Sequence, residues 1–246
     1  MRRVLFLLCL PAFAQWPAIP NKNIPRLPDG KPYLEAPAPK AADGKPDLTG
    51  LWDMDMAVVS FQTVMTDEEG AKLMKPETAA LVATRRQRFA TDGPTARCLP
   101  VGIARAYPGV WRVVQSPELM VVLYGLNPTR EIFLDGRALP TDPSPTWLGY
   151  STGHWEGDEL VVKTRGLNGK SWLDVYGHPL SEQARVVERF RRPRFGRMEV
   201  DITVDDPGAY NAPFQIRHAF DISVDKPIAN EVVCNENNTS LQHMLK

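Results

Sequence analysis

The sequence has little cysteine, little histidine and no excess charge of either sign, and these shortages exclude several classes of protein. Its 246 residues include three cysteines and four histidines, and 29 basic residues balance 29 acidic ones. A chain without net charge creates no overall field that would attract nucleic acid or anionic lipid. The arginines of residues 185–197 lie in a segment with strand alternation and interleaved acids, so we interpret them as an outward sheet face and expect no nucleic-acid partner.

Long hydrophobic runs are missing as well. No segment approaches the ~20 apolar residues of a membrane-spanning helix, so we expect no transmembrane segment in the mature chain. The short apolar run Val4–Leu10 follows Arg2 and Arg3, and Ala12-Phe13-Ala14 places small residues where signal peptidase reads them. This pattern is typical of a secretory signal peptide, residues 1–14, cleaved after Ala14. The mature protein is therefore expected in the periplasm or outside the cell.

Removing this signal leaves two cysteines, Cys98 and Cys234. Disulfides persist in exported proteins, and an even number of cysteines without CxxC spacing favours one structural bridge. Such a bridge would tie the end of the chain to its middle and contribute about 4 kcal/mol in the chain-entropy model.

Motifs that would indicate a cofactor are also absent. The sequence contains no Gly-rich phosphate loop, no dinucleotide-binding fingerprint and no Gly-x-Ser-x-Gly nucleophile elbow. His154, Asp158 and His178 lack the compact spacing of metal ligands. We therefore expect neither an organic cofactor nor a bound metal.

Proline, in contrast, is abundant. The chain has 23 prolines, whereas average usage predicts roughly 12, and this excess excludes a mostly helical bundle. Eight of them fall in residues 15–47, which we interpret as an arm that lies on the domain or a tether outside it. Within this segment Asp29-Gly30-Lys31-Pro32 recurs as Asp43-Gly44-Lys45-Pro46, and the repeat predicts two similar turns.

Residues 48–246 are expected to form a single β-rich domain with helices at about 67–89. Thr66 and Glu69 form a capping box, and Pro76 suits the first turn of a second helix. The basic end of that helix contains Arg85 and Arg86. We interpret it as a solvated helix end in preference to an anion-binding patch.

The remaining sequence alternates with a period of two, and short turns separate the segments. This pattern predicts a mainly β fold, an antiparallel meander that forms a lipocalin-like barrel or a sandwich. The expected strands are residues 51–61, 111–115, 120–124, 130–134, 147–155, 160–164, 185–191, 198–204 and 214–222.

Two polar residues point with the apolar face of these strands. Glu188 shares its face with Val186 and Phe190, and His218 shares its face with Ile216 and Phe220. A buried charge without a partner costs several kcal/mol, so both side chains must be paired. They belong either to a structural network that fixes sheet register or to a cavity with shifted pKa values that supports acid–base chemistry.

Aromatic and titratable residues concentrate between residues 147 and 178. Aromatic rings with polar groups at their edges suit a binding site, formed by loops at the end of the barrel, for a sugar-like or polycyclic ligand. A kinked hairpin with aromatic packing would explain the same composition. The substrate-binding candidates are Trp147, His154, Trp155, Trp172 and Tyr176, and the catalytic candidates Tyr150, Asp174 and His178 lie among them.

Several motifs together resemble an uncharacterised family of exported bacterial β-rich proteins. They are the Cys98-Leu99-Pro100 element, the hairpin Trp155-Glu156-Gly157-Asp158-Glu159-Leu160-Val161-Val162 and the strand Glu188-Arg189-Phe190. The resemblance covers most of the mature chain and implies an exported β-rich domain, but it carries over no activity. The chain departs from the family pattern at Tyr150 and Asn235, where histidine is expected.

Two function classes remain. The first is a cofactor-independent acid–base enzyme, a lyase, isomerase or hydrolase, that acts on a small natural product. Glu188 or Asp174 would be its base. His218 or His178 would be its acid, and Tyr150 would orient the substrate. The second is a binding protein for a small apolar or aromatic ligand. A structural module of the cell envelope also remains open, and the sequence does not indicate an oligomeric state.

Overall fold

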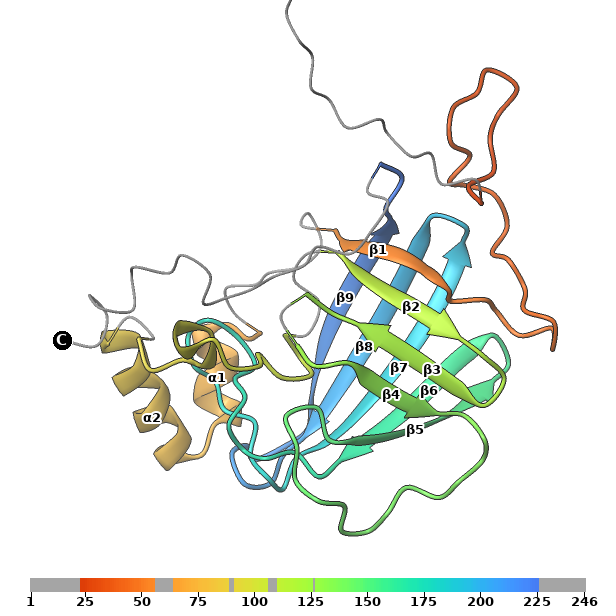
Figure 1. Cartoon of the computed structure of the whole chain (residues 1–246). Coiled ribbons are helices and arrows are strands. Elements are labelled where there is room, and N and C mark those ends of the chain that lie inside the picture. The colour runs from red at the N-terminus through yellow and green to blue at the C-terminus, as the bar shows by residue number, and fades with distance from the viewer. Residues whose placement is uncertain (1–22, 56–63, 89–90, 106–109, 126, 226–246) are drawn as a thin grey trace, which may run out of the picture.

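Nine strands form a closed barrel in the computed structural model of the chain (Figure 1). The structure describes residues 23–55, 64–88, 91–105, 110–125 and 127–225. The signal peptide and Cys234 lie outside these residues, so cleavage after Ala14 and the Cys98–Cys234 bridge stay predictions. The strands are β1 (Gly50–Met54), β2 (Trp111–Gln115), β3 (Leu119–Leu123), β4 (Arg130–Phe133), β5 (Tyr150–Glu156), β6 (Glu159–Arg165), β7 (Arg185–Arg194), β8 (Arg197–Asp205) and β9 (Phe214–Ile222).

The prediction of a mainly β fold is confirmed, and the barrel is confirmed over the sandwich. β1 pairs with both β2 and β9, and this pairing closes the ring. One pair differs from the predicted antiparallel meander, because β4 and β5 are parallel. The connecting residues 134–149 contain three prolines and are too long for a hairpin. They cross back to the edge where β4 began, so β5 runs in the same direction as β4.

Alternation places the core inside the barrel. On β8, Met198, Val200 and Ile202 are fully buried, and the residues between them face outward. Trp52 and Phe190 are among the largest buried side chains of the interior. The described interior is therefore filled with side chains, as expected for a barrel of this size.

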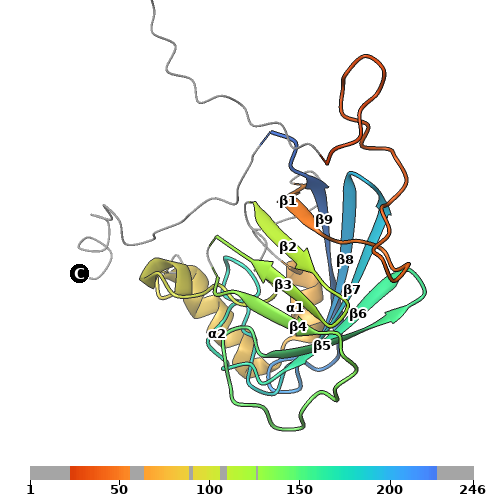
Figure 2. The ribbon, with the colours of Figure 1, turned by 45° about the vertical axis from the view of Figure 1, so that its right-hand side comes forward.

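The two ends of the barrel differ (Figures 1 and 2). At one, which we call the helical end, lie α1 (Asp67–Leu73), α2 (Pro76–Gln87), the short 3-10 helix η1 (Pro94–Arg97) and the connection between β6 and β7. The predicted capping box is present, since Thr66 accepts the Glu69 N–H and the Glu69 side chain accepts the Thr66 N–H. None of the described helices is long and apolar enough to cross a bilayer.

Part of the arm, as we call residues 23–48, lies against the opposite end, and the first turn of the arm projects away from the barrel (Figure 1). The backbone N–H groups of Phe195 and Gly196, in the β7–β8 turn, donate to Ala36 and Leu34 at 2.7 and 2.9 Å. The repeated Asp-Gly-Lys-Pro segments form two similar turns, as predicted. Each is closed by a β-bridge, and each has a glycine at positive φ, 84° at Gly30 and 80° at Gly44.

Candidate functional site

Glu188 lies inside the barrel and pairs with Arg130 from the first position of β4. Arg130 Nη1 donates to Glu188 Oε1 at 3.0 Å, and Nη2 donates to Oε2. The guanidinium also donates to Ser151 Oγ and to Thr164 Oγ1, the latter at 3.0 Å. Arg130 and Glu188 are 2% and 0% exposed. This buried network joins β4, β5, β6 and β7 and satisfies both oxygens of the carboxylate.

His218 lies on the same inner surface. Its register partner on β8 is Val200, two residues from Ile202, which pairs with Glu188. The imidazole Nε2 is 3.2 Å from the carbonyl oxygen of Ala104, so this nitrogen carries a hydrogen and donates it. Burial lowers the pKa of His218, while the bond to Ala104 and the charge of Glu188 oppose this shift. His218 is therefore held neutral inside the barrel.

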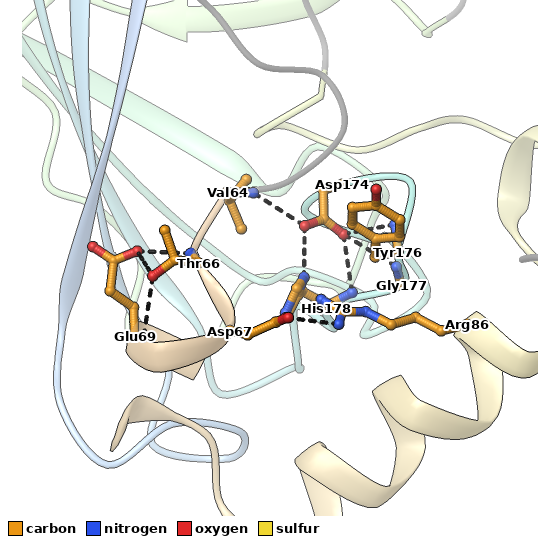
Figure 3. A network of polar contacts seen from close by, with 9 residues as sticks. All are labelled: Val64, Thr66, Asp67, Glu69, Arg86, Asp174, Tyr176, Gly177 and His178. Atoms are coloured by element: carbon orange, nitrogen blue, oxygen red, sulfur yellow. Dashed lines mark hydrogen bonds and ion pairs between the residues drawn. The ribbon is translucent and has the colours of Figure 1, made fainter. Parts of the chain in front are cut away.

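Asp174 and His178 form a second buried cluster at the helical end (Figure 3). His178 Nδ1 is 2.6 Å from Asp174 Oδ2, and both side chains are 1% exposed. Asp174 Oδ1 accepts the backbone N–H groups of Tyr176, Gly177 and His178, at 3.0 to 3.3 Å. These bonds fold residues 174–178 into a tight turn around the carboxylate.

The turn requires glycine at position 177. Gly177 has φ +90°, and a Cβ there would lie 2.5 Å from Arg85 Cδ. The backbone N–H of Val64, just before α1, donates to Asp174 Oδ2 at 3.1 Å and is a further hydrogen-bond donor to the carboxylate. Asp174 is thus the centre that joins the turn to the start of the helical segment.

The electrostatics of this cluster determine the tautomer of His178. Burial raises the pKa of Asp174, but the hydrogen bonds and the interaction with His178 outweigh burial, so the pKa lies below its ordinary value. An ionised carboxylate only accepts hydrogen bonds. His178 Nδ1 therefore donates to the carboxylate, and Nε2 is the ring nitrogen that does not face Asp174.

Two predicted ligand-binding aromatics pack beside this cluster against α2. Arg85 lies 4.4 Å above the Trp172 ring and donates to the Gly177 carbonyl. Arg86 lies 4.8 Å above the Tyr176 ring and donates to Asp67. Both guanidinium groups at the end of α2 therefore lie on aromatic rings, and the Arg86 side chain is still 34% exposed.

Trp147 and Tyr150 lie elsewhere, at a pocket of about 440 Å³ where β4 and β5 begin. Tyr150 stacks on Phe133 with a centroid distance of 5.2 Å. Its hydroxyl accepts a bond from Arg137 at 3.2 Å. The pocket is lined by Pro128, Thr129, Arg130, Glu131, Phe133, Thr146, Trp147, Leu148, Gly149, Tyr150 and Ser151.

His154 and Trp155 are not brought to either cluster. They lie at the far end of β5, beside the β5–β6 turn, where the register pairs them with Val161 and Leu160. His154 is half exposed and its Nε2 is 3.0 Å from Glu156 Oε1. The aromatic and titratable candidates between residues 147 and 178 therefore do not form one site. They lie at three places: the pocket, the Asp174–His178 cluster and this turn.

Sequence reasoning missed Arg130 and Phe133. Both lie in a predicted strand, and Arg130 has the same inward phase as Ile132. The alternation of β4 could therefore have indicated that Arg130 points inward, but an arginine at the first position of a strand is equally compatible with a solvent-exposed side chain.

Among the residues that the structure describes, no three His, Cys, Asp or Glu side chains converge to hold a metal ion. No family model matches the chain, and neither a curated protein nor a solved structure shows significant similarity to it.

Proposed function

We propose that the mature chain is an exported, cofactor-independent acid–base enzyme, a lyase, isomerase or hydrolase, that acts on a small natural product. His178 transfers the proton, and Asp174 is its positioning residue. The observation that carries this proposal is the 2.6 Å contact between His178 Nδ1 and Asp174 Oδ2. A buried carboxylate that holds one ring nitrogen fixes the imidazole and stabilises the imidazolium that forms when Nε2 accepts a proton.

Glu188 is assigned a structural role in this proposal. A general base needs a lone pair directed at the substrate, and both oxygens of Glu188 accept bonds from Arg130. His218 donates its Nε2 hydrogen to Ala104, so it too serves the packing of the barrel. Tyr150 faces the pocket at β4 and β5, and we assign it to ligand binding there.

The test uses the mature protein and an untargeted mass-spectrometric comparison of a small-molecule extract before and after incubation. We expect at least one compound to be consumed by the wild type. His178→Asn should slow this consumption by about 10²–10⁴-fold, because the Asn amide can still donate to Asp174 but lacks Nε2. The thermal unfolding midpoint should change little.

His154→Asn is the matched control, since His154 is half exposed and bonded to Glu156. It should leave consumption unchanged. If His178→Asn consumed the compound at the wild-type rate, proton transfer by His178 would be excluded.

The second candidate function is a non-catalytic binding protein for a small apolar or aromatic ligand. The aromatic pocket formed by Phe133, Trp147 and Tyr150 favours it. In that case a compound would co-purify with the protein and be recovered chemically unchanged. Trp147→Ala would release it, whereas His178→Asn would retain it.

A further inference from the structure

The pocket at the start of β4 and β5 combines aromatic walls with one uncompensated carboxylate. We propose that it binds a small organic cation, with Glu131 as the counter-ion. This site is independent of proton transfer by His178, because neither His178 nor Asp174 is among its lining residues.

The aromatic walls come from both strands of the parallel pair and from the segment before β5. Phe133 and Tyr150 are stacked at an interplanar angle of 28°. Arg137 lies 3.9 Å from the Phe133 ring and bonds to the Tyr150 hydroxyl, so this stack is held in place. Trp147 is half-buried and packs against the core. Because Arg137 and Tyr150 already contact the Phe133 ring, the rings of Trp147 and Tyr150 supply the electrostatic attraction for an ammonium group.

Glu131 supplies the charge. It is an exposed β4 residue two positions before Phe133, and both line the pocket. Within the described part of the chain, the side chain of Glu131 forms no hydrogen bond or ion pair. Other outward acids of the barrel are paired, since Glu156 and Glu159 bond to Arg189 and Asp201 bonds to Arg217.

The remaining charged residue of the lining does not cancel Glu131. Arg130 directs its guanidinium into the barrel, where Glu188 neutralises it. The pocket therefore carries a single net negative charge beside π faces. Its volume of about 440 Å³ lies in the range of small-molecule sites. A neutral sugar could stack on the same rings, but it would leave the charge of Glu131 without compensation, so the charge favours a cation.

The test is isothermal titration calorimetry of the mature protein with choline and with dimethylbutanol, its neutral carbon isostere. We expect choline to bind about tenfold more tightly than the isostere, because only choline gains cation–π and ionic attraction. Glu131→Gln and Trp147→Ala should each weaken choline binding several-fold. Circular dichroism should show the wild-type fold in both variants.

Glu118→Gln is the matched control, because Glu118 is also exposed but lies in the β2–β3 turn. It should bind choline as the wild type does. Absence of choline binding, equal affinity for the isostere, or unchanged affinity in Glu131→Gln would overturn the proposal. Loss of turnover in His178→Asn with intact choline binding would separate this site from the proposed catalytic cluster.

Discussion

At the scale of single residues, the Arg130–Glu188 pair shows how a charge is kept inside the barrel. Its carboxylate and guanidinium are both buried, and isolated charges in such a place cost several kcal/mol. The pair is therefore conditional: each partner is tolerated only because the other is present.

Glu188→Gln is expected to destabilise the fold by about 3–5 kcal/mol, because Arg130 then stays buried without its counter-charge. Urea unfolding measures this loss. The double variant Arg130→Met/Glu188→Leu should regain most of it, since Ser151 and Thr164 still bond to each other at 2.9 Å. Unchanged stability of Glu188→Gln together with lost turnover would instead assign Glu188 to catalysis.

The inward direction of Glu188 was predictable, but its partner was not. Alternation on β7 specifies the face of each residue, since Val186 and Phe190 are buried with Glu188. Alternation says nothing about which distant strand supplies the partner, and Arg130 is 58 positions away. The Asp174–His178 contact escaped prediction for another reason. It arises from a turn around a carboxylate, which has no periodic signature.

At the scale of elements, one buried arginine helps to fasten the arm to the barrel. Arg192 on β7 donates to the carbonyl oxygens of Asp47 and Phe195 and lies 4.9 Å from the Trp52 ring. Burial lowers its pKa to about 10, so it is still charged at neutral pH. A planar group with several donors suits this bridging position.

Arg192→Lys is expected to cost about 2 kcal/mol, because a lysine ammonium cannot reach both carbonyl oxygens at once. Limited proteolysis should then cut the arm at Lys40 or Lys45 faster than in the wild type. Arg185→Lys is the control. Its partner Asp205 has an exposed side chain and belongs to β8, not to the arm, and we expect a change within about 0.5 kcal/mol. Equal protection of the arm in Arg192→Lys and the wild type would show that Arg192 does not hold it.

The strands themselves were the most predictable elements. In a strand with one buried face, every second side chain is buried, and the alternation of apolar and polar residues on β7, β8 and β9 therefore predicted which side chains point inward. The parallel pairing of β4 and β5 was not predictable in this way, because residues 134–149 have no pattern that indicates where they return. The pocket depends on that pairing, so of its lining residues only Trp147 and Tyr150 were named as candidates, and their neighbours on β4 were not.

At the scale of the whole molecule, buried titratable groups make global stability depend on pH. The folded-state pKa of His218 lies below its ordinary value of 6.5, so the unfolded chain binds more protons near that pH. The contribution of His218 is complete above about pH 6.5 and is lost as pH falls toward the folded-state value.

We expect the free energy of unfolding to decrease between pH 7.5 and 5, with at most about 1.4 kcal/mol per pH unit from this one proton. Chemical denaturation across this range measures the slope. His218→Gln should flatten it, whereas His154→Gln, at an exposed site, should not. Identical slopes in wild type and His218→Gln would mean that other groups account for the dependence.

The number of strands in the ring has a consequence of its own. Strands that alternate up and down around a closed ring return to the starting direction only if their number is even. A ring of nine must contain at least one pair of neighbours that run the same way, and here β4 and β5 are that pair. The odd number of strands thus requires one parallel pair in the barrel. The long connection of residues 134–149 and the pocket both occur at this pair. Adding or removing one strand would abolish the need for it.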